Sequence, residues 1–400
     1  MKHAYIYGGA RSAFGRHGGT LATVRTDDLA AVVIKKVLAS LRFDPNDIED
    51  VIAGCTNQAG EDSRNVARNA SLLAGLPVTI PGITVNRLCA SGLAAVIQSG
   101  HAVSTNHGDL FIAGGVEGMS RAPFVVAKAE SAFSRTFTSY DTTMGERFPN
   151  PMIHKNFGAF SMPETGDNVA RDYEITREQA DEFALSSQLK FAAAEKSGFF
   201  KDEIVSVPVK KGKDEITDFA LDEHPRRDSN IQGLIKLKSL FPNGVVTAGN
   251  ASGINDGAAF LAIGSEEIGK KSGVKPIARI VASAASGVEP RIMGIGPVTA
   301  IKKALKRAEL SLKDMGIIEI NEAFASQVLS CVKLLELSPT DKRINPNGGA
   351  IAVGHPLGAS GARLVLTAAR QLQLSNSRYA IVSLCVGLGQ GLAMIIERAK

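Results

Sequence analysis

Short apolar runs alternate with longer amphipathic stretches along the chain. The runs at 50–55 (DVIAGC) and 379–384 (YAIVSL) are mostly apolar and bounded by polar residues, which predicts buried strands. Further strands are expected at 4–7, 110–113, 278–283 and 316–320. Apolar positions at helical spacing predict helices at 26–41, 64–74, 164–172, 177–197 and 297–308. Strands that alternate with helices indicate an α/β fold.

The order of these elements occurs twice. DVIAGC aligns with IIEINE, NRLCASG with GHPLGASG, and FIAGGVEG with VSLCVGLGQG, at one shift of roughly 270 residues. Short glycine-rich words align easily by chance, so the shared order carries more weight than any single match. The repeat predicts two copies of one α/β unit.

Between the two copies, prolines and basic residues become more frequent. We interpret residues 120–249 as a loop domain inserted into the first half. The first half then comprises residues 1–119 and 250–273, and the second half comprises residues 274–400. Insertions on a rigid scaffold commonly supply substrate contacts, so this segment is expected to contact a ligand.

Charge and length exclude several classes of protein. A net charge of +5 on 400 residues is weaker than nucleic-acid binding proteins usually carry. The first residues lack a continuous apolar signal region, and no apolar run approaches the length of a membrane span. We expect neither nucleic acid nor membrane as a partner, and a cytoplasmic location.

Four cysteines are spread over the chain, at Cys55, Cys89, Cys331 and Cys385. They contain no CxxC pair, so the spacing typical of zinc and iron–sulfur sites is missing and we expect no metal. So few cysteines in so long a chain also argue against a disulfide framework. A reducing compartment is the simplest interpretation.

Cys89 lies in NRLCASG, where small residues follow it at the start of an expected helix. The positive end of a helix favours a thiolate, so a lowered thiol pKa is expected there. Small neighbours also leave room for an acylated sulfur. A buried structural cysteine is equally compatible with this motif alone.

Three other motifs carry candidate chemistry. His355 is surrounded by glycines in GHPLGASG, which indicates close approach of backbone and ligand, and neutral imidazole near a thiol can generate a nucleophile. Cys385 begins CVGLGQG, in which the Gly387 amide could donate to an oxyanion. Asn321 begins NEAF at the end of an apolar strand, where helix capping is the plainer explanation. Structural roles remain open for all three.

Two familiar enzyme motifs are missing. GGVEG and GLGQG fall short of a full GxGxxG, and the second lies too late to open a βαβ unit, so nucleotide redox chemistry is disfavoured. GxSxG is missing as well, which removes support for a serine hydrolase.

Taken together, NRLCASG, AGNASGINDGAA, NEAF, GHPLGASG and CVGLGQG resemble the thiolase family in content and order, over essentially the whole chain. The resemblance implies two thiolase-type halves in α-β-α-β-α layers with an inserted loop domain. It also implies an acyltransferase that cleaves a 3-oxoacyl-CoA with coenzyme A, or runs the reverse condensation. Coenzyme A would be a co-substrate, with no permanently bound cofactor.

Residue roles follow from the same resemblance. Cys89 matches the nucleophile that carries the acyl group, and His355 matches the base that activates it. Cys385 matches the second cysteine, which exchanges a proton with the α-carbon. Asn321 matches a residue that acts with His355, through a water, on one oxyanion. The amides of Cys89 and Gly387 match a second oxyanion hole.

Positions that contact coenzyme A or the acyl group can be matched in the same way. Ser252 corresponds to a residue near the pantetheine arm, and Met162 and Phe324 correspond to the lining of the acyl pocket. Arg226 corresponds to a basic contact at the nucleotide end. The family also suggests a homodimer or homotetramer.

The segments NQAGEDSRNVAR, YDTTMGERFPNP and SMPETGDNVA most resemble the 3-oxoadipyl-CoA branch of the family. Ser161 stands where many acetoacetyl-CoA thiolases have histidine, which weakens the acetoacetyl-CoA alternative. A dicarboxylate substrate would need a cationic partner, for which Arg135, Arg147 and His154 are candidates by location.

Three alternatives remain. A ketoacyl synthase pairs its cysteine with two histidines or with histidine and asparagine, and does not need Cys385. A non-catalytic acyl-CoA-binding homologue would be expected to lack one of the three catalytic matches. A cysteine hydrolase would release free acid without coenzyme A.

Overall fold

A single mixed β-sheet organises the computed structural model, which describes residues 2–212 and 215–399. Within these residues the sheet has 11 strands, in the order β13-β14-β15-β12-β1-β11-β5-β3-β4, with β2 paired to β11 and β8 to β1. The strands are β1 Tyr5–Ser12, β2 Gly15–Arg16, β3 Asp50–Gly54, β4 Gly82–Val85, β5 Leu110–Gly118, β8 Ile204–Val205, β11 Asn255–Gly264, β12 Ala278–Gly287, β13 Met315–Ile320, β14 Tyr379–Val386 and β15 Gln390–Arg398.

The pairing pattern repeats between the two halves of the sheet. β3 pairs parallel with β5, and β5-β11 and β11-β1 are antiparallel. In the other half β13 pairs parallel with β14, and β14-β15 and β15-β12 are antiparallel. The halves meet where β1 pairs with β12 through Tyr5↔Arg279 and Ile6↔Ala278. The same topology on both sides agrees with the duplication expected from the repeated motifs.

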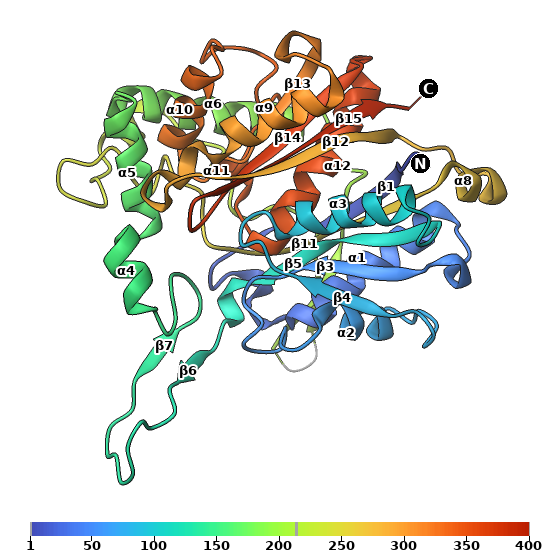
Figure 1. Ribbon diagram of the computed structural model, residues 1–400, viewed down its shortest axis with the longest axis horizontal. Helices are drawn as coiled ribbons and strands as arrows, with labels where there is room; N and C mark the ends of the chain where they lie inside the picture. Colours follow the sequence, from blue (N-terminus) through green and yellow to red (C-terminus); the bar gives the residue numbers. More distant parts are fainter. Residues whose placement is uncertain (1, 213–214, 400) are drawn as a thin grey trace.

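Helices cover the two half-sheets in layers (Figure 1). Helices α3 (Ser91–Ser104) and α12 (Leu357–Ser375) lie side by side between the half-sheets and bury the central apolar core. Helices α1 (Thr26–Leu41) and α2 (Val66–Leu73) cover the outer face of the first half. Helices α9 (Gly296–Ala308) and α10 (Ala325–Leu334) cover that of the second. This is the expected α-β-α-β-α order.

The α3-α12 contact depends on glycine. A Cβ on Gly92 would collide with the carbonyl oxygen of Gly358, and one on Gly361 would collide with the amide of Leu93. The two helices therefore approach at backbone distance near their N-termini. This contact brings the segments just before them, which contain Cys89 and His355, to one place.

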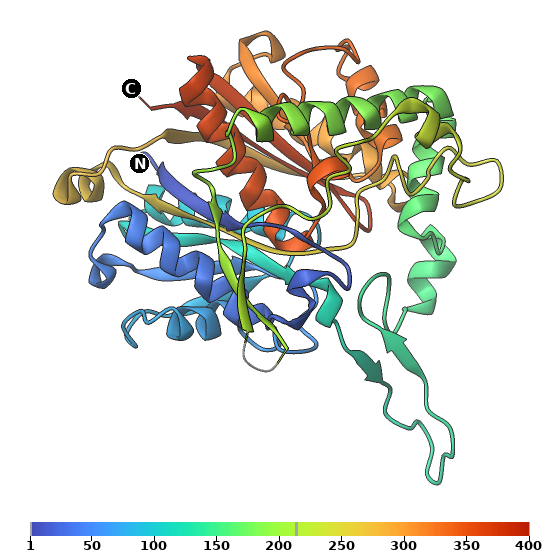
Figure 2. The same ribbon diagram turned by 180° about the vertical axis from the view of Figure 1, so that it is seen from behind.

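Residues 120–249 lie mostly outside the sheet. The hairpin of β6 (Phe124–Val126) and β7 (Ser139–Asp141) extends from the body as an arm, with α4 (Pro151–Phe157) beside its base (Figures 1 and 2). Helix α6 (Arg177–Lys196) crosses over the second half (Figure 2). The remaining elements of the segment are α5 Met162–Asp172, β9 Val207–Lys211, β10 Glu215–Phe219 and α7 Ile231–Ile235.

Short elements complete the fold. The α-helices are α8 Glu266–Ser272 and α11 Ala350–Val353. The 3-10 helices are Thr20–Thr23, Pro45–Asp47, Met119–Arg121, Pro290–Ile295 and Leu312–Asp314. Among the described residues, no helix combines the length and apolarity that crossing a membrane requires.

Candidate active site

Cys89 lies at the end of a tight turn that leads into α3. Leu88 has a positive φ of 45°, which is costly for a side chain other than glycine, so its surroundings must hold it. The Asn86 side chain accepts from the Leu88 amide at 2.9 Å. Ser91 Oγ accepts from the Arg87 amide at 2.8 Å and donates to the Leu88 carbonyl at 2.7 Å. Two polar side chains thus fix the backbone on which Cys89 is presented.

The environment of Cys89 favours the neutral thiol. Burial raises the pKa of Cys89 to about 11, although hydrogen bonding by the backbone amides of Gly387 and of Cys89 itself opposes the rise. The pKa lowering expected from the helix terminus is therefore wrong, because desolvation outweighs the favourable dipole. A base must remove the proton before the sulfur can attack.

Cys385 and Gly387 approach Cys89 from the second half. Cys385, near the end of β14, is 1% exposed and packs in an apolar cluster with Val246, Met293, Ala323 and Phe324. Burial raises the pKa of this thiol well above its usual value. A Cβ on Gly387 would lie 3.0 Å from Leu88 Cδ1 and 3.9 Å from Met162 Sδ. The two cysteine segments and the start of α5 therefore converge.

His355 is buried behind this point. Its Nδ1 lies 2.6 Å from Ser360 Oγ, and its Nε2 lies 3.3 Å from Asn321 Nδ2. Burial, and secondarily the positive charge of Arg363, lowers the pKa of His355 to about 3. The imidazole is therefore neutral at physiological pH and able to accept a proton.

The backbone of His355 is anchored to the first half. Gly354 has a φ of 100°, and a Cβ there would collide with the Asn255 amide group. Asn255 accepts from the His355 amide at 2.8 Å and donates to the Gly15 carbonyl at 3.0 Å. Glycine at 354 is required both by its conformation and by this contact.

The NEAF segment supports the site and does not cap a helix with its asparagine. Helix α10 starts after Phe324, which has no side-chain capping bond, so the capping explanation for Asn321 is wrong. The backbone amide of Asn321 donates to the Ser383 carbonyl at 2.9 Å. The side-chain oxygen of Asn321, Oδ1, is buried and has no hydrogen-bond partner in the described structure. Glu322 accepts from Ser187, Asn345 and the Ile351 amide, and so joins this segment to α6 and to the loop before α12.

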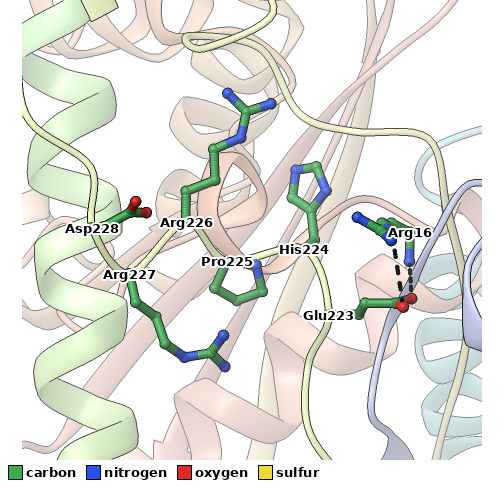
Figure 3. A pocket seen from close by; sticks show the side chains of 7 residues that line it. All are labelled: Arg16, Glu223, His224, Pro225, Arg226, Arg227 and Asp228. Carbon is green, nitrogen blue, oxygen red and sulfur yellow. Dashed lines mark hydrogen bonds and ion pairs between the residues drawn. The ribbon is translucent and has the colours of Figure 1, made fainter. Parts of the chain in front are cut away.

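The positions matched to coenzyme A form a continuous path. The Ser252 amide donates to the Ala323 carbonyl at 2.9 Å, beside the cluster that holds Cys385. Gly253 follows, and a Cβ on it would collide with the His224 ring. His224 lines a pocket of about 500 Å³ together with Arg16, Glu223, Pro225, Arg226, Arg227 and Asp228 (Figure 3).

Arg226 and Arg227 differ in direction (Figure 3). Arg227 points to one side, where it pairs with Glu195 at 2.6 Å. Arg226 extends the opposite way, and its guanidinium is drawn without a partner among the residues that line the pocket. An exposed arginine in a polar pocket can bind a phosphate group.

A buried carboxylate was not anticipated from the sequence. Glu117, in β5, accepts from the amides of Thr56, Asn57 and Gly358, at 3.1, 3.1 and 2.8 Å. It lies with Cys55 and Asp62, whose ligand atoms are all within 4.8 Å of one another. Three hydrogen bonds from backbone amides satisfy the Glu117 oxygens, while burial raises the pKa of this carboxyl group to about 7. The sequence signal that could have indicated this buried carboxylate was a glutamate inside the apolar run LFIAGGVEG.

Each of the three cations considered for a dicarboxylate has a different setting. Arg135 is exposed in the arm between β6 and β7. Arg147 donates to the backbone carbonyls of Asn57 and Thr142. His154 pairs with Glu146 at 2.7 Å. Arg147 and His154 therefore have partners of their own.

The arrangement can perform acyl transfer. It combines two thiols, a neutral buried imidazole, and backbone amides directed at the sulfur of one thiol. A nucleophile, a base and donors for a developing oxyanion are the groups that thioester exchange requires.

Comparisons with known proteins agree with this geometry. Residues 4–267 match the model of the thiolase N-terminal domain, and residues 274–398 match that of the thiolase C-terminal domain. The chain is 54% identical to the 3-oxoadipyl-CoA/3-oxo-5,6-dehydrosuberyl-CoA thiolase of Escherichia coli and 53% identical to a β-ketoadipyl-CoA thiolase of Acinetobacter baylyi, over the full length of both proteins.

Solved structures show the same fold. Human mitochondrial 3-ketoacyl-CoA thiolase in complex with CoA superposes with a TM-score of 0.92 at 37% identity, covering 100% of this chain and 98% of that one. The acetyl-CoA acetyltransferase of Bacillus anthracis gives the same TM-score and identity, covering 100% and 99%. The fold class predicted from the sequence is thereby confirmed, and the chain belongs to the thiolase family of acyltransferases.

Proposed function

We propose that this enzyme cleaves 3-oxoadipyl-CoA with coenzyme A, giving succinyl-CoA and acetyl-CoA through a thioester on Cys89. The observation that carries the proposal is the approach of the Cys385 strand end to the Cys89 turn, beside the α3–α12 contact whose second helix follows the neutral His355. Relatives named for 3-oxoadipyl-CoA or β-ketoadipyl-CoA, 50–54% identical over nearly the full chain, support the substrate.

The first half-reaction forms the acyl-enzyme. Cys89 Sγ attacks the 3-oxo carbon while its proton moves to His355 Nε2. The bond between carbons 2 and 3 then breaks, and its electron pair forms the enolate of acetyl-CoA. Cys385 donates its proton to carbon 2, which releases acetyl-CoA and leaves the succinyl group on Cys89.

The second half-reaction restores the enzyme. The Cys385 thiolate takes the thiol proton of an incoming coenzyme A, whose sulfur attacks the succinyl carbonyl. Cys89 leaves as a thiolate and recovers its proton from His355. Amides of Cys89 and Gly387 would hold the oxyanion on the acyl carbonyl, and Asn321 with His355 would hold the enolate oxygen.

Coenzyme A is proposed to follow the path described above. Arg226 would contact a phosphate at the nucleotide end, and Ser252 would lie along the pantetheine arm. Met162 and Phe324 would border the acyl group. The inserted domain, residues 120–249, would thereby contribute much of the coenzyme A surface, because it supplies both Arg226 and Met162.

A substrate panel tests the function. Purified enzyme is assayed with 3-oxoadipyl-CoA, acetoacetyl-CoA and a long 3-oxoacyl-CoA, each with and without coenzyme A. We expect the highest kcat/KM with 3-oxoadipyl-CoA. Preference for acetoacetyl-CoA would favour the acetyl-CoA acetyltransferase alternative, and no coenzyme-A-dependent cleavage of any of them would favour a non-catalytic acyl-CoA-binding protein.

We also propose a homodimer or homotetramer in the cytoplasm. The arm exposes large apolar side chains, among them Phe124, Phe133 and Phe137 at 72%, 99% and 75%, and such patches commonly mark protein contacts. Unpaired cysteines fit a reducing compartment. Light scattering of the intact protein and of Phe133→Ser/Phe137→Ser, and cell fractionation, test these points. A monomer in solution would contradict the proposed oligomer. Enzyme found outside the cytosolic fraction would contradict the proposed location.

A further inference from the structure

Ser360 makes two contacts at the back of the active site. It lies in the first turn of α12 and is fully buried. Its Oγ is 2.9 Å from the Pro356 carbonyl oxygen and 2.6 Å from His355 Nδ1. Both contacts are short enough to be hydrogen bonds.

Counting protons assigns a direction to each bond. A serine hydroxyl has one hydrogen to donate and two lone pairs that accept. The Pro356 carbonyl can only accept, so the hydroxyl hydrogen points to it, as expected for a helical serine bonded to the carbonyl four residues earlier. Ser360 Oγ must then accept from His355 Nδ1, which therefore carries a hydrogen.

The contact of the other ring nitrogen of His355, Nε2, indicates the same tautomer. His355 Nε2 faces the amide nitrogen of Asn321 at 3.3 Å, and an amide nitrogen is a donor. Nε2 must therefore offer its lone pair. The low pKa of His355, caused by burial, keeps the ring neutral, so one ring nitrogen carries a hydrogen and the other is bare.

We propose that Ser360 is a positioning residue that holds His355 in the Nδ1–H tautomer. Nε2 then carries no hydrogen in the resting enzyme and can exchange its hydrogen bond from Asn321 for the proton of Cys89. The inference rests on the proposed function of His355. When Nε2 is protonated, the Nδ1–H···Oγ bond persists, so the ring does not turn during turnover. A hydroxyl also brings no negative charge that would trap the imidazolium, which favours return of the proton to the departing sulfur.

The tautomer can be observed without measuring activity. The chain has seven histidines, and nitrogen NMR of the resting enzyme labelled with [15N]histidine separates protonated from bare ring nitrogens. A His355→Asn variant identifies the signals of His355 by their loss. We expect a protonated Nδ1 and a bare Nε2. A protonated Nε2 with a bare Nδ1 would overturn the proposal.

Variants test the consequence for the reaction. Ser360→Ala should slow the burst of acetyl-CoA from 3-oxoadipyl-CoA roughly 10- to 100-fold, the usual effect of losing the partner that orients a functional histidine. It should also introduce the Nε2–H tautomer. Ser360→Thr keeps a hydroxyl that can bond the same carbonyl, and should retain the Nδ1–H tautomer and most of the rate.

Ser99 offers a matched control. It is a buried serine in α3 whose Oγ donates to the Ala95 carbonyl at 3.0 Å, four residues earlier, and within the described residues it forms no hydrogen bond with a histidine. Ser99→Ala should leave both burst and tautomer unchanged. An unchanged tautomer and burst in Ser360→Ala would overturn the proposal. If Ser360→Ala fails to fold, the wild-type spectrum still decides. A wild-type enzyme that shows the expected tautomer but no thiolytic activity would refute only the proposed function.

Discussion

The ends of two corresponding strands, β5 in the first half and β14 in the second, have different tasks. The residue before the last of β5 is Glu117, whose oxygens accept from three backbone amides. The residue before the last of β14 is Cys385, a thiol in an apolar cluster. Both strands occupy the same position in the repeated topology. A satisfied carboxylate fixes loops, whereas an unpaired thiol can exchange a proton.

The segments before the middle helices are more alike. Cys89 precedes α3, His355 precedes α12, and each is held by a tight turn with a positive φ, at Leu88 and Gly354. The duplication thus supplies two equivalent helix starts, both proposed for chemistry, and two equivalent strand ends, of which we propose one for chemistry and one for support. Substitutions at these positions test whether chemistry and support are divided in this way.

Cys385→Ala is expected to have the largest effect. Loss of the proposed acid should slow cleavage of 3-oxoadipyl-CoA about 10³-fold, within the usual range for a general acid or base. Acylation of Cys89 by succinyl-CoA forms no carbon–hydrogen bond, and the coenzyme A thiolate can leave without the Cys385 proton, so this step should slow far less than cleavage. Stopped-flow assays and mass spectrometry of the protein measure the two steps. Carbon–carbon cleavage at the wild-type rate would refute the role of Cys385.

Glu117→Ala should affect stability more than chemistry. Three buried amides would lose their acceptor, and each unsatisfied group costs about 1–3 kcal/mol, so we expect a loss of about 3 kcal/mol or more in the free energy of unfolding. Urea denaturation measures this loss, and Glu117→Gln, which keeps a side-chain oxygen, should lose less. If Glu117→Ala were as stable as the wild type but inactive, the division between support and chemistry would be wrong.

Arg226→Ala should have a moderate effect confined to the nucleotide end of the substrate. We expect KM for coenzyme A to rise about tenfold, or about 1.4 kcal/mol, for loss of a charge-assisted phosphate contact. The matched control is Arg227→Ala, since that side chain pairs with Glu195. With a pantetheine thioester, which lacks the nucleotide, Arg226→Ala should behave as wild type. An equal loss with that substrate would contradict a phosphate contact.

The smallest expected effect is that of pH on the acylation step. Burial lowers the pKa of His355 to about 3, so the ring stays neutral at every pH above that value. Burial also raises the pKa of Cys89 to about 11, so the thiol stays protonated below it. The acetyl-CoA burst without free coenzyme A should therefore vary less than about threefold between pH 5.5 and 8. A steep fall below pH 6.5 would indicate an ordinary histidine.

Much of the secondary structure follows from local patterns. The helix predicted at 26–41 is α1, and that at 177–197 is α6, one residue shorter. Glycines caused the errors among the strands. β5 runs to Gly118, through the glycines interpreted as its exit, because β3 and β11 pair with it on both sides. β11 and β15 were not predicted. Both partners of β11 are distant in sequence, whereas β15 pairs with the adjacent β14 on one side and with the distant β12 on the other.

Some features of the site could also be predicted from local sequence, and others could not. Cysteine and histidine in glycine-rich motifs were visible as candidates, because few structural needs demand those residues among so many glycines. The pKa of Cys89 was not predictable, because the burial that raises it arises only when the chain folds and outweighs the hydrogen bonds from the Gly387 and Cys89 amides. Ser360 and Asn255 were missed, since a serine or asparagine gains its meaning only from what lies beside it in the fold.

Trapping the acyl-enzyme shows whether Cys89 carries the succinyl group. The enzyme is mixed with 3-oxoadipyl-CoA in the absence of free coenzyme A, quenched in acid, digested and examined by mass spectrometry. We predict a succinyl thioester on the peptide that contains Cys89, equimolar with released acetyl-CoA and removed by added coenzyme A. Acetyl-CoA release with no succinyl group on Cys89, or undiminished turnover by Cys89→Ala, would contradict the account.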